Sequence, residues 1–470
     1  MYVSTRGAAP DLGFEDVLLA GLARDGGLYV PAEYPVLRPD AIEGFSGKRF
    51  DEVATVVLTA LSGGAMPLER LAAMTRAAYA SFGHPAVTPL VQIGANRWVL
   101  ELFHGPTLAF KDVAMQLLAR LIDDVLARRG QRATIVAATS GDTGGAAIEA
   151  FRHATRADVF VLFPDGRVSD VQRRMMTTPK ARHLHALSVA GTFDDCQARV
   201  KDMFNHHAFR DRLQLSGVNS INWARIAAQV TYYFVAAVAL GAPSRAVSFV
   251  VPTGNFGDIF AGYVARRMGL PIERLTIATN SNDILARTVE SGVYETRGVV
   301  VTSSPSMDIQ VSSNFERYLF EASGRDAEKI AGFMQSLKQS GRFELGADIT
   351  RMLRAEFTGF AASEAVVAQT IKDVQADSGY LLDPHTACAA AAAAVAGGTP
   401  EIILATAHPA KFPDAMEAVT GRRPGLPARL AGLMTEPEQM TQLPNDVAAV
   451  EAFIESRSSV LRPLVSGGRA

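Results

Sequence analysis

Lys111 lies where a turn-rich segment gives way to an amphipathic helical pattern. The segment 101–110 before it contains a glycine, a proline and a threonine, and the residues after it carry apolar side chains at helical spacing. Such a junction can display a reactive amine. When a lysine amine is partly desolvated its pKa falls, and it then forms Schiff bases with carbonyl compounds. The alternative is a surface lysine that only begins a helix, and this short motif does not decide between the two.

A turn with two glycines at residues 254–258 is the second feature that suits chemistry. It follows an apolar run of strand character, 246–251, and precedes a helical pattern that extends through Met268. Backbone N–H groups at the start of a helix favour an anion, so this order of strand, turn and helix predicts a phosphate site. The alternative is an ordinary turn in which glycine only supplies a positive φ.

Two further apolar runs end in polar turns before a helical pattern. One turn, 139–143, is rich in hydroxyls and could hold a carboxylate, although Ser140 or Asp142 can equally be a plain N-cap. The other turn is 406–412. Ligands of open α/β sheets bind at the carboxyl ends of the strands, so the three turns can converge on one crevice.

The arrangement of expected elements divides the chain into three parts. Helical patterns dominate the first part, 1–90, which we expect to be an accessory domain. Strand-like and helical stretches alternate in 91–245 and again in 246–470, as expected for βα units on largely parallel sheets. This alternation lapses into charged helical sequence at about 312–375, which predicts a helical insertion.

Composition excludes several classes of protein. The 470 residues are 48% hydrophobic, enough for a large core in more than one lobe, and the net charge is only −2. Acidic and basic residues are interspersed, so we expect no binding to nucleic acid or to a membrane. Cys196 and Cys388 lack the spacing of a metal site or a disulfide framework, and no metal is expected.

The longest apolar stretches have a structural interpretation. The stretch 226–240 is too short to cross a bilayer and carries a glutamine and two tyrosines, so we expect a buried helix. The alanine-rich run 387–396 predicts a close-packed helix. The N-terminus has no apolar signal segment, and we therefore expect a cytoplasmic protein.

Several separated blocks of sequence carry a family resemblance. They include Ser-Gly-Asp-Thr at 140–143, Gly-Asn-Phe-Gly at 254–257 and Thr-Ala-His-Pro-Ala-Lys at 406–411. The others lie at 2–7, 20–28, 101–112, 219–225 and 307–317. In this order the blocks resemble threonine synthases of the longer form found in bacteria and fungi, which are fold-type II enzymes that depend on pyridoxal phosphate. The resemblance implies an α/β fold with two lobes on largely parallel sheets, an N-terminal accessory domain and a helical insertion.

The resemblance implies a carbon–oxygen lyase that acts on phosphate in the last step of threonine biosynthesis. Its substrate would be O-phospho-L-homoserine, which reacts with water by γ-elimination and β-addition to give L-threonine and phosphate. Lys111 would form the Schiff base with the cofactor and move protons at the substrate carbons. Thr406 would face the pyridine nitrogen, where a hydroxyl cannot keep a proton on the ring as a carboxylate can. The cofactor phosphate would be held by Gly254, Asn255, Phe256, Gly257 and Asp258.

The family's substrate contacts map onto two further groups of residues. The substrate carboxylate would be bound by Thr139, Ser140 and Thr143, and the substrate phosphate by Asn222, Arg225, Ser313, Asn314 and Arg317. An arginine suits a phosphate because its planar fork donates two aligned hydrogen bonds. Either arginine can instead be structural, paired with Glu316 or another carboxylate.

Some alternatives stay open at the level of sequence. Cofactor-binding motifs do not separate the synthase from a phospho-lyase, which releases phosphate and a 2-oxo acid instead of adding water. A dehydratase or an inactive cofactor-binding protein is disfavoured, because neither requires this whole set of residues. Asp142 stands where many fold-type II enzymes have an asparagine, so its role is open, as is that of His104. The oligomeric state, a monomer or a homodimer, is also open.

Overall fold

The structure of the protein is a computed structural model, which describes residues 1–393 and 398–461. The chain forms two compact units. Unit 1 consists of Met1–Leu117 and Ser220–Arg429, and unit 2 consists of Leu118–Asn219 and the described part of Leu430–Ala470. The domain boundaries expected near residues 90 and 245 stay a prediction.

Unit 2 is built on a five-stranded sheet in which every pairing is parallel. In spatial order the strands are β15 (Thr441–Leu443), β7 (Leu184–Val189), β6 (Ala157–Pro164), β5 (Ala133–Ala138) and β8 (Leu215–Ser216). β5 and β6 are buried at every position, as expected for parallel strands that are covered on both faces. The helices are the greater part of α5 (Lys111–Arg128), α6 (Asp142–Ala150), α7 (Asp170–Thr177), α8 (Phe193–Asn205), α9 (His207–Leu213), α19 (Val447–Arg457) and the short η4 (Ser459–Leu461).

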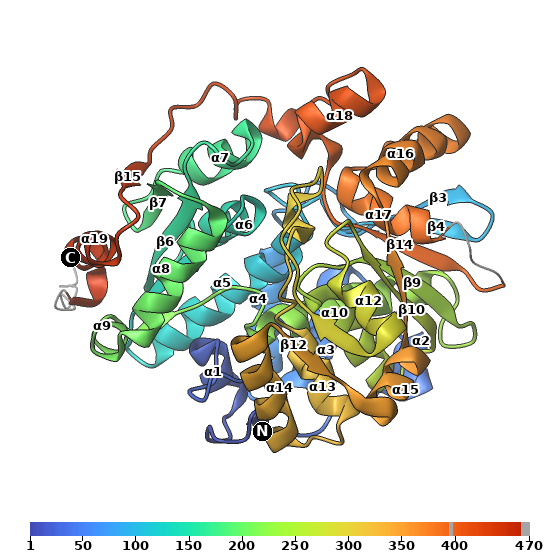
Figure 1. The fold of residues 1–470 in the computed structure, drawn as a ribbon, viewed down its shortest axis with the longest axis horizontal. Helices are drawn as coiled ribbons and strands as arrows, with labels where there is room; N and C mark the ends of the chain where they lie inside the picture. The colour runs from blue at the N-terminus through green and yellow to red at the C-terminus, as the bar shows by residue number, and fades with distance from the viewer. Residues whose placement is uncertain (394–397, 462–470) are drawn as a thin grey trace. The chain divides into compact units, whose positions relative to one another are not determined.

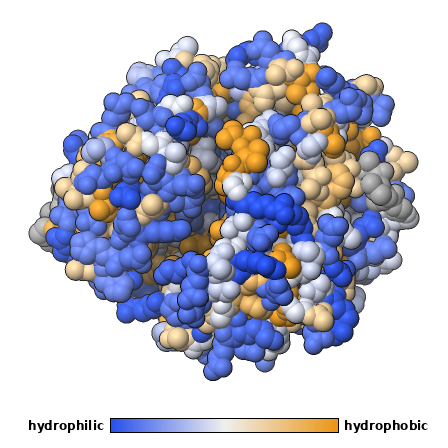
Figure 2. Space-filling model, viewed as in Figure 1, coloured by the Kyte–Doolittle hydropathy of each residue, from blue (hydrophilic) through white to orange (hydrophobic). Residues whose placement is uncertain are grey.

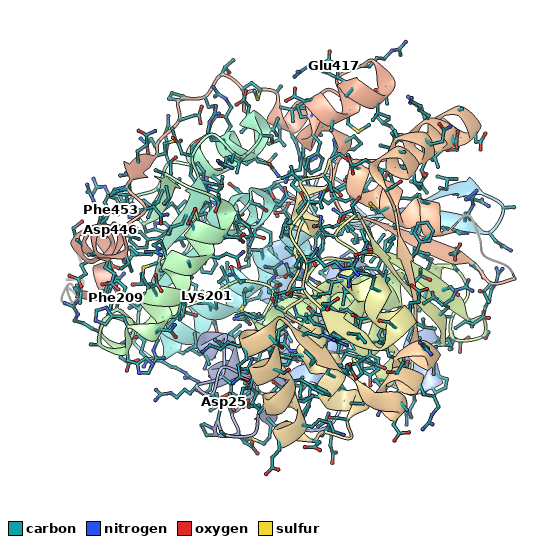
Figure 3. The ribbon with its side chains drawn as sticks, in the orientation of Figure 1. Asp25, Lys201, Phe209, Glu417, Asp446 and Phe453 are labelled. Carbon is teal, nitrogen blue, oxygen red and sulfur yellow. The ribbon has the colours of Figure 1, made fainter. Side chains whose placement is uncertain are left out.

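The C-terminal helix α19 contributes to the core of unit 2. Phe160 of β6 and Phe209 of α9 belong to one buried cluster, and Phe453 of α19 packs against it. The ring of Phe453 meets that of Phe160 edge-on, with 6.4 Å between their centroids. Asp446 caps α19 by accepting a hydrogen bond of 2.8 Å from the backbone N–H of Ala449 (Figure 3). Residues after 430 therefore complete a unit that the chain begins at about residue 118.

Unit 1 contains a six-stranded mixed sheet, shown in Figure 1. In spatial order its strands are β13 (Phe357–Ala361), β10 (Ile272–Thr279), β9 (Val247–Pro252), β14 (Glu401–Ala405), β4 (Arg97–Glu101) and β3 (Leu90–Gly94). Only the pairing of β3 with β4 is antiparallel within this sheet. The carboxyl ends of β9, β10 and β14 therefore lie at one edge, where the turns 254–258 and 406–412 begin.

Side chains of β9 and β10 alternate between two helical layers. Val250 and Ala278 belong to the cluster around α17 (Pro384–Ala393) and α16 (Glu364–Ser378). Phe249 faces the other way, and its ring lies 4.7 Å from that of Tyr233 in α10 (Trp223–Ala239). This period of two buries both faces of the sheet. α10 is the buried helix expected at 226–240; part of the predicted alanine-rich helix is α17, and residues 394–396 of that prediction lie outside the described residues.

The N-terminal segment packs within unit 1. It consists of β1 (Tyr2–Ser4), α1 (Phe14–Ala20), β2 (Tyr29–Pro31), α2 (Pro39–Glu43), α3 (Phe50–Ser62) and α4 (Leu68–Tyr79). Asp25 fixes its first loop by accepting from the backbone N–H groups of Ala8, Ala9 and Gly27 at 2.8–3.0 Å (Figure 3). Trp223 at the start of α10 donates to the Tyr2 hydroxyl at 3.1 Å. This hydrogen bond joins the N-terminal segment to α10, the first helix after the chain returns to unit 1 at Ser220.

The predicted helical insertion at 312–375 is mainly helical but not wholly so. The remaining elements of unit 1 are α11 (Gly257–Arg267), α12 (Ile284–Ser291), β11 (Val293–Glu295), η1 (Pro305–Met307), α13 (Phe315–Ala322), α14 (Ala327–Ser340), β12 (Arg342–Glu344), α15 (Gly346–Glu356), η2 (Pro409–Lys411), α18 (Pro413–Thr420) and η3 (Ala428–Leu430). β12 pairs with β11, and β13 is an edge strand of the main sheet. β13 was not predicted, because it is only five residues long and has a glycine at its centre.

The surface shows no broad apolar face in the orientation of Figure 2, where hydrophilic residues predominate. Among the described residues, three consecutive exposed valines, 299–301, stand out, with exposed fractions of 48, 51 and 89%. Within residues 1–393 and 398–461, no helix is both long enough and apolar enough to cross a membrane.

We predict that Gly262→Ala destabilises unit 1. A Cβ atom at this position of α11 would lie 2.7 Å from Cε1 of Tyr233 and 3.0 Å from Cδ2 of Leu275. The Tyr233 ring cannot move away easily, because its hydroxyl is hydrogen-bonded to Asp258. Overpacking of this kind costs about 1–3 kcal/mol, and the thermal unfolding midpoint should fall.

Gly332→Ala in α14 is the matched control, since nothing lies within 4 Å of a Cβ there. Alanine in a helix interior is favoured over glycine by roughly 0.5–1 kcal/mol, so this variant should melt at or above the wild-type temperature. Equal midpoints for both variants would contradict the close packing of α10 on α11.

Candidate active site

The predicted phosphate loop connects β9 to α11 in unit 1. Phe256 adopts a left-handed conformation with φ of 61°, which is uncommon for a large residue and requires support from its surroundings. That support is aromatic: the Phe256 ring lies 5.2 Å from that of Phe315 and 5.4 Å from that of Phe357. Phe256 is also the N-cap residue of α11 and supplies no side-chain cap. The helix therefore begins with backbone N–H groups directed towards the turn, as an anion site requires.

The segment 305–314 lies directly against this loop. A Cβ atom at Gly254 would lie 3.1 Å from the carbonyl oxygen of Ser306 and 3.3 Å from Cα of Met307, and both of these are backbone atoms. The Ser312 hydroxyl donates to the carbonyl of Gly254 at 2.7 Å. Asn314 donates to the carbonyl of Asn255 from its backbone N–H at 3.0 Å and from Nδ2 at 3.1 Å. Glycine at 254 is therefore favoured by a close approach of two backbones, since a Cβ atom would force one of them to shift.

Lys111 begins α5, and its amine lies beside the same segment. Its Nζ atom donates to the Ser306 hydroxyl at 3.5 Å, the outer limit of a hydrogen bond, and lies 4.9 Å from the centre of the Phe110 ring. Since Ser306 also contacts Gly254, the structure brings the reactive lysine and the glycine loop together through one turn.

Thr406 follows β14, and its segment is paired with the residues before Lys111. The backbone N–H of Phe110 donates to the carbonyl of Thr406 at 2.8 Å, and that of His408 donates to Leu108 at 3.0 Å. Lys411 extends the contact by donating from Nζ to the carbonyl of Thr107 at 2.8 Å. Thr406, which is buried, and Lys111 are thus held by one backbone arrangement.

Asp258 is a buried carboxyl at the start of α11. Its Oδ1 atom accepts from the hydroxyls of Tyr232 and Tyr233, the second at 3.0 Å, and its Oδ2 atom has no hydrogen-bond partner among the described residues. Burial raises the pKa of Asp258 to about 7, although both hydrogen bonds and the charge of Lys111 act in the opposite direction. The carboxyl can therefore carry a proton near neutral pH beside the turn proposed to bind an anion.

Two of the predicted substrate-phosphate residues lie in α10 of unit 1. Asn222 is the N-cap: its Oδ1 accepts from the N–H of Ala224 at 3.0 Å, and its Nδ2 donates to the carbonyl of Leu18 at 2.9 Å. Arg225 is one turn inside the helix and only 2% exposed. Burial lowers the pKa of Arg225 to about 10, against the favourable charges of Tyr232 and Asp112.

The other three, Ser313, Asn314 and Arg317, belong to the segment that leads into α13. The Ser313 hydroxyl lies 3.5 Å from Oδ1 of Asn255. Arg317 is fully buried, and it donates to the carbonyl of Tyr29 at 3.0 Å, to that of Ile221 at 2.7 Å and to Oδ1 of Asn314. Burial lowers its pKa to about 9.

The suggestion that Arg317 pairs with its neighbour Glu316 is wrong. Glu316 instead pairs with Arg6 at 2.9 Å and accepts from the hydroxyl of Thr5 at 2.6 Å. Arg317 is instead held by Asn314 and by the carbonyl oxygens of Tyr29 and Ile221. Local sequence pattern could not reveal these carbonyl partners, because both are more than 90 residues away in the chain.

The predicted carboxylate-binding residues Thr139, Ser140 and Thr143 lie in unit 2, at the turn between β5 and α6. The N-cap position is occupied by Gly141, with φ of 135°, so neither Ser140 nor Asp142 is the N-cap that the sequence suggested. Thr139 takes over the capping, since its hydroxyl oxygen accepts from the N–H groups of Gly141 and Gly144, each at 2.9 Å. Asp142 accepts from Nε2 of Gln172 at 2.9 Å.

His104 lies beside a separate cavity of about 440 Å³ in unit 1. Its Nε2 atom is 2.7 Å from Oε2 of Glu101, and Tyr380 donates to Oε1 of the same carboxylate at 2.8 Å. These bonds hold the pKa of Glu101 below its ordinary value despite burial. His408, on the same cavity, has its pKa lowered to about 4 by burial and is therefore neutral. The side chains of His104 and Tyr380 are both hydrogen-bonded to Glu101, which supports a structural role for His104.

Comparison with known proteins identifies the family. The sequence matches the family models described as threonine synthase N terminus over residues 1–79, pyridoxal-phosphate dependent enzyme over 82–402 and threonine synthase, C-terminal over 386–454. It is 49% identical to threonine synthase of Pseudomonas aeruginosa, over 98% of this chain and 100% of the relative. The chain belongs to the threonine synthase family.

Further threonine synthases agree with this assignment. The relative from Saccharomyces cerevisiae is 40% identical over 98% of this chain and 99% of its own. A crystal structure of threonine synthase with bound pyridoxal phosphate, from Brucella melitensis, is 61% identical and superposes with a TM-score of 0.95, over 97% of this chain and 99% of that one. The resemblance inferred from the separated blocks is confirmed, and with it the α/β fold, the enzyme class and the dependence on pyridoxal phosphate. The roles of individual residues stay predictions.

Three residues of unit 1 near the candidate site were not found from the sequence: Ser306, His385 and Asp383. Ser306 adjoins Lys111, His385 accepts a hydrogen bond from the N–H of Ser306, and Asp383 is hydrogen-bonded to His385. The only available signal was that Ser306 directly precedes the conspicuous block 307–317. Asp383 and His385 precede the alanine-rich run 387–396 and resemble an ordinary helix start.

We predict a pH dependence of stability that is specific to Asp258. The pKa of this group is about 7 in the folded protein and 3.8 ordinarily. Between these two pH values the folded state keeps a proton on Asp258 that the unfolded state loses. The contribution of this proton to the free energy of unfolding is therefore complete below about pH 4 and is lost as the pH rises to about 7. Relative to Asp258→Asn, the cofactor-free wild type should lose on the order of 4 kcal/mol over this range.

Thermal midpoints of both proteins at about pH 4 and about pH 7 measure the effect. Asp348→Asn is the control, because that carboxylate is 84% exposed in a surface ion pair. A wild-type-minus-variant difference that stays constant with pH would show that Asp258 is ionised throughout.

Proposed function

We propose that this member of the family converts O-phospho-L-homoserine and water to L-threonine and phosphate, with pyridoxal phosphate bound in unit 1. The observation that carries the proposal is the convergence of three features at one turn. Ser306 approaches Nζ of Lys111 with its hydroxyl and Gly254 with its carbonyl, so the lysine and the anion loop lie on either side of the same residue. A reactive amine beside an anion site is what a phosphorylated aldehyde requires.

The residues of unit 1 fit the cofactor. The loop 254–258 offers backbone N–H groups at the start of α11, with no Cβ at Gly254 or Gly257 to keep a phosphate away. A proton on Asp258 near neutral pH removes a negative charge that would repel that phosphate. Thr406 offers a neutral hydroxyl for the ring nitrogen. When bound, pyridoxal phosphate withdraws electrons from the substrate carbon attached to the amino group.

Lys111 carries the proton chemistry in this proposal. It would hold the cofactor in the resting enzyme, and once released by the substrate amine it would take protons from Cα and Cβ and return protons at Cγ and, at the end, at Cα, while water supplies the hydroxyl at Cβ. A lysine can act in both directions only if its amine is neutral for part of the cycle. Its contacts with the Phe110 ring and the Ser306 hydroxyl are with neutral groups, which are compatible with both forms of the amine.

We assign the substrate phosphate to Arg225, Asn222, Ser313, Asn314 and Arg317. Arg225 is the strongest member, because a guanidinium buried in this way stays cationic at neutral pH and can stabilise the phosphate as it departs. The contacts of Asn222 and Arg317 with backbone carbonyls favour a supporting role for these two. For the substrate carboxylate we assign Ser140 and Thr143 of unit 2, with Thr139 shaping their turn.

We also propose that the enzyme works in the cytoplasm, as a monomer or a homodimer. The biosynthetic activity of the family supports the location. Light scattering of the purified protein would distinguish the two assembly states.

One prediction of the proposed function concerns the reaction products. Incubating the cofactor-loaded protein with O-phospho-L-homoserine should release threonine and phosphate in equal amounts, with little 2-oxobutanoate. Phosphate matched by 2-oxobutanoate would mean that the chain is a phospho-lyase.

Lys111→Ala should abolish turnover and the visible absorbance of the bound cofactor, whereas Lys338→Ala, which changes an exposed lysine of α14, should leave both unchanged.

Another prediction tests whether the loop 254–258 binds the cofactor. Gly254→Ala should weaken the binding of pyridoxal phosphate by about tenfold or more, equivalent to at least about 1.4 kcal/mol, because the new Cβ meets backbone atoms of Ser306 and Met307 that cannot rotate away. Equilibrium titration of the cofactor-free protein measures this. Gly298→Ala is the control, since nothing lies within 4 Å of a Cβ there. Unaltered affinity in Gly254→Ala would remove the loop from the cofactor site.

A further inference from the structure

Ser306 is held beside Lys111 by a buried histidine and a buried aspartate. The backbone N–H of Ser306 donates to Nε2 of His385 at 3.2 Å, and Nδ1 of His385 lies 2.8 Å from Oδ2 of Asp383. Asp383 and His385 are 1% and 3% exposed. We propose that Ser306 is a further catalytic residue of the reaction proposed above, which contacts the lysine amine through its hydroxyl, and that Asp383 and His385 position it.

The hydrogen bonds define the state of the imidazole. Nε2 accepts from the N–H of Ser306, so it carries no proton, and the proton on Nδ1 is donated to Asp383. Asp383 is itself fixed at the start of α17, where it accepts from the N–H of His385 at 2.9 Å, from the N–H of Thr386 at 3.1 Å and from the Thr386 hydroxyl. The ring of His385 packs 4.8 Å from that of Phe412. His385 is therefore a rigid, neutral acceptor.

The turn that carries Ser306 is fixed on its other side by Asp308. Its Oδ1 atom accepts from Nδ2 of Asn280 at 2.8 Å, from Nδ2 of Asn282 at 3.0 Å and from the Thr302 hydroxyl at 2.6 Å. Its Oδ2 atom accepts from the N–H of Thr302 at 2.9 Å. Both flanks of η1 are thus tied to buried polar groups, and the position of the serine does not depend on the lysine.

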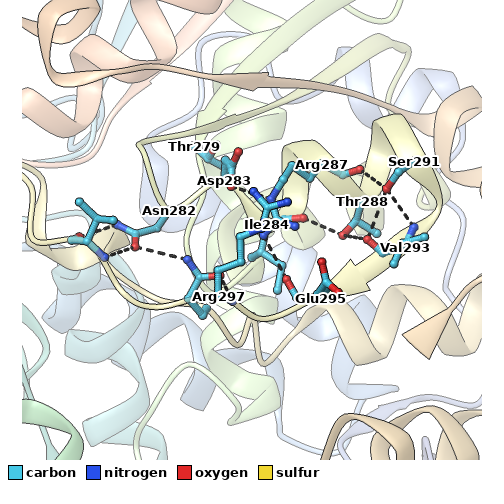
Figure 4. A network of polar contacts seen from close by, with 12 residues as sticks. Thr279, Asn282, Asp283, Ile284, Arg287, Thr288, Ser291, Val293, Glu295 and Arg297 are labelled. Carbon is cyan, nitrogen blue, oxygen red and sulfur yellow. Dashed lines mark hydrogen bonds and ion pairs between the residues drawn. The ribbon is translucent and has the colours of Figure 1, made fainter. Parts of the chain in front are cut away.

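The polar network continues beyond Asn282, as Figure 4 shows. Arg287 bridges Oδ1 of Asp283, at 2.7 Å, and the carbonyl of Glu295, at 3.0 Å. Asn282 accepts from the N–H of Val300 at 2.9 Å. The segment 295–308 is therefore hydrogen-bonded to residues at the end of β10 and in α12. These bonds hold the turn that carries Ser306 close to Lys111.

A hydroxyl at this place suits a lysine that changes its protonation state. It accepts a hydrogen bond from the ammonium form and donates one to the free amine, so the amine can stay in one place while it gives up or takes a proton. No covalent bond forms and no proton is lost to the serine. A carboxylate in the same position would favour the ammonium form alone.

The decisive variants delete the hydroxyl. Ser306→Ala should lower kcat for threonine formation by about 10–100-fold, at the low end of general acid–base effects, with KM and the affinity for pyridoxal phosphate changed less than about threefold. The visible absorbance of the cofactor-loaded protein should titrate with pH at a midpoint displaced by about half a unit or more from that of the wild type. Ser303→Ala, a neighbouring serine outside these contacts, should match the wild type in every measurement.

Variants of the histidine separate positioning from general stability. His385→Phe should reproduce the loss of kcat and the displaced absorbance titration, and His385→Gln, which keeps an acceptor, should recover part of both. Because the histidine acts through the serine, the double variant Ser306→Ala/His385→Phe should be no slower than the worse single variant.

Several outcomes would overturn the proposal. A Ser306→Ala protein with wild-type kcat and titration midpoint, in a preparation where Lys111→Ala is inactive, removes Ser306 while leaving the proposed function intact. Should Ser306→Ala fail to fold, Ser306→Gly deletes the same hydroxyl and gives the same test. If the wild type forms no threonine, the proposed function fails, and the absorbance titration still shows whether Ser306 contacts the lysine. Additive losses in the double variant would exclude the positioning role of His385.

Discussion

The close approach of two backbones at Gly254 is the constraint on which the candidate site depends. The carbonyl oxygen of Ser306 and the Cα of Met307 would lie 3.1 and 3.3 Å from a Cβ atom at 254, closer than a side chain normally packs. This contact places the segment 305–314 on the loop, and hydrogen bonds from Ser312 and Asn314 to loop carbonyls then fix its register. Because the same segment presents Ser306 to Lys111, the anion loop and the reactive amine are positioned by one arrangement of main chain.

The site also contains several ionisable groups whose burial opposes folding. Asp258 has a raised pKa, and Arg225 and Arg317 have lowered ones, in each case because desolvation disfavours the charged form. Apolar residues of similar volume would commonly be at least as stable in such positions. Asp258 and Arg317 instead have specific partners: Tyr232 and Tyr233 donate to Asp258, and Arg317 donates to backbone carbonyls. Buried charge that is supported in this way is expected where a ligand must be bound rather than where a core must be filled.

The sequence predicted the parts of the site that depend on local pattern. The loop 254–258, the turn 406–412 and the start of α5 at Lys111 are each bounded by a strand or a helix that apolar periodicity reveals. Ser306 and His385 could not be found in this way, because their contacts join residues 195 and 79 positions apart. The same reason explains the error over Arg317, whose partner carbonyls belong to Tyr29 and Ile221. Composition likewise could not reveal that residues after 430 return to complete unit 2.

Several groups near Lys111 share one property that suits a proton-transferring amine. The Phe110 ring and the Ser306 hydroxyl, which it contacts in unit 1, are both neutral. The buried carboxyl whose charge it influences, Asp258, has a pKa of about 7 and so is not a permanent anion. The imidazole behind Ser306 is neutral as well, because its Nε2 is occupied as an acceptor. A fixed negative charge in any of these places would hold the lysine as an ammonium, which can donate a proton but cannot remove one. These neighbours therefore suit an amine that gives up and takes back a proton during the reaction.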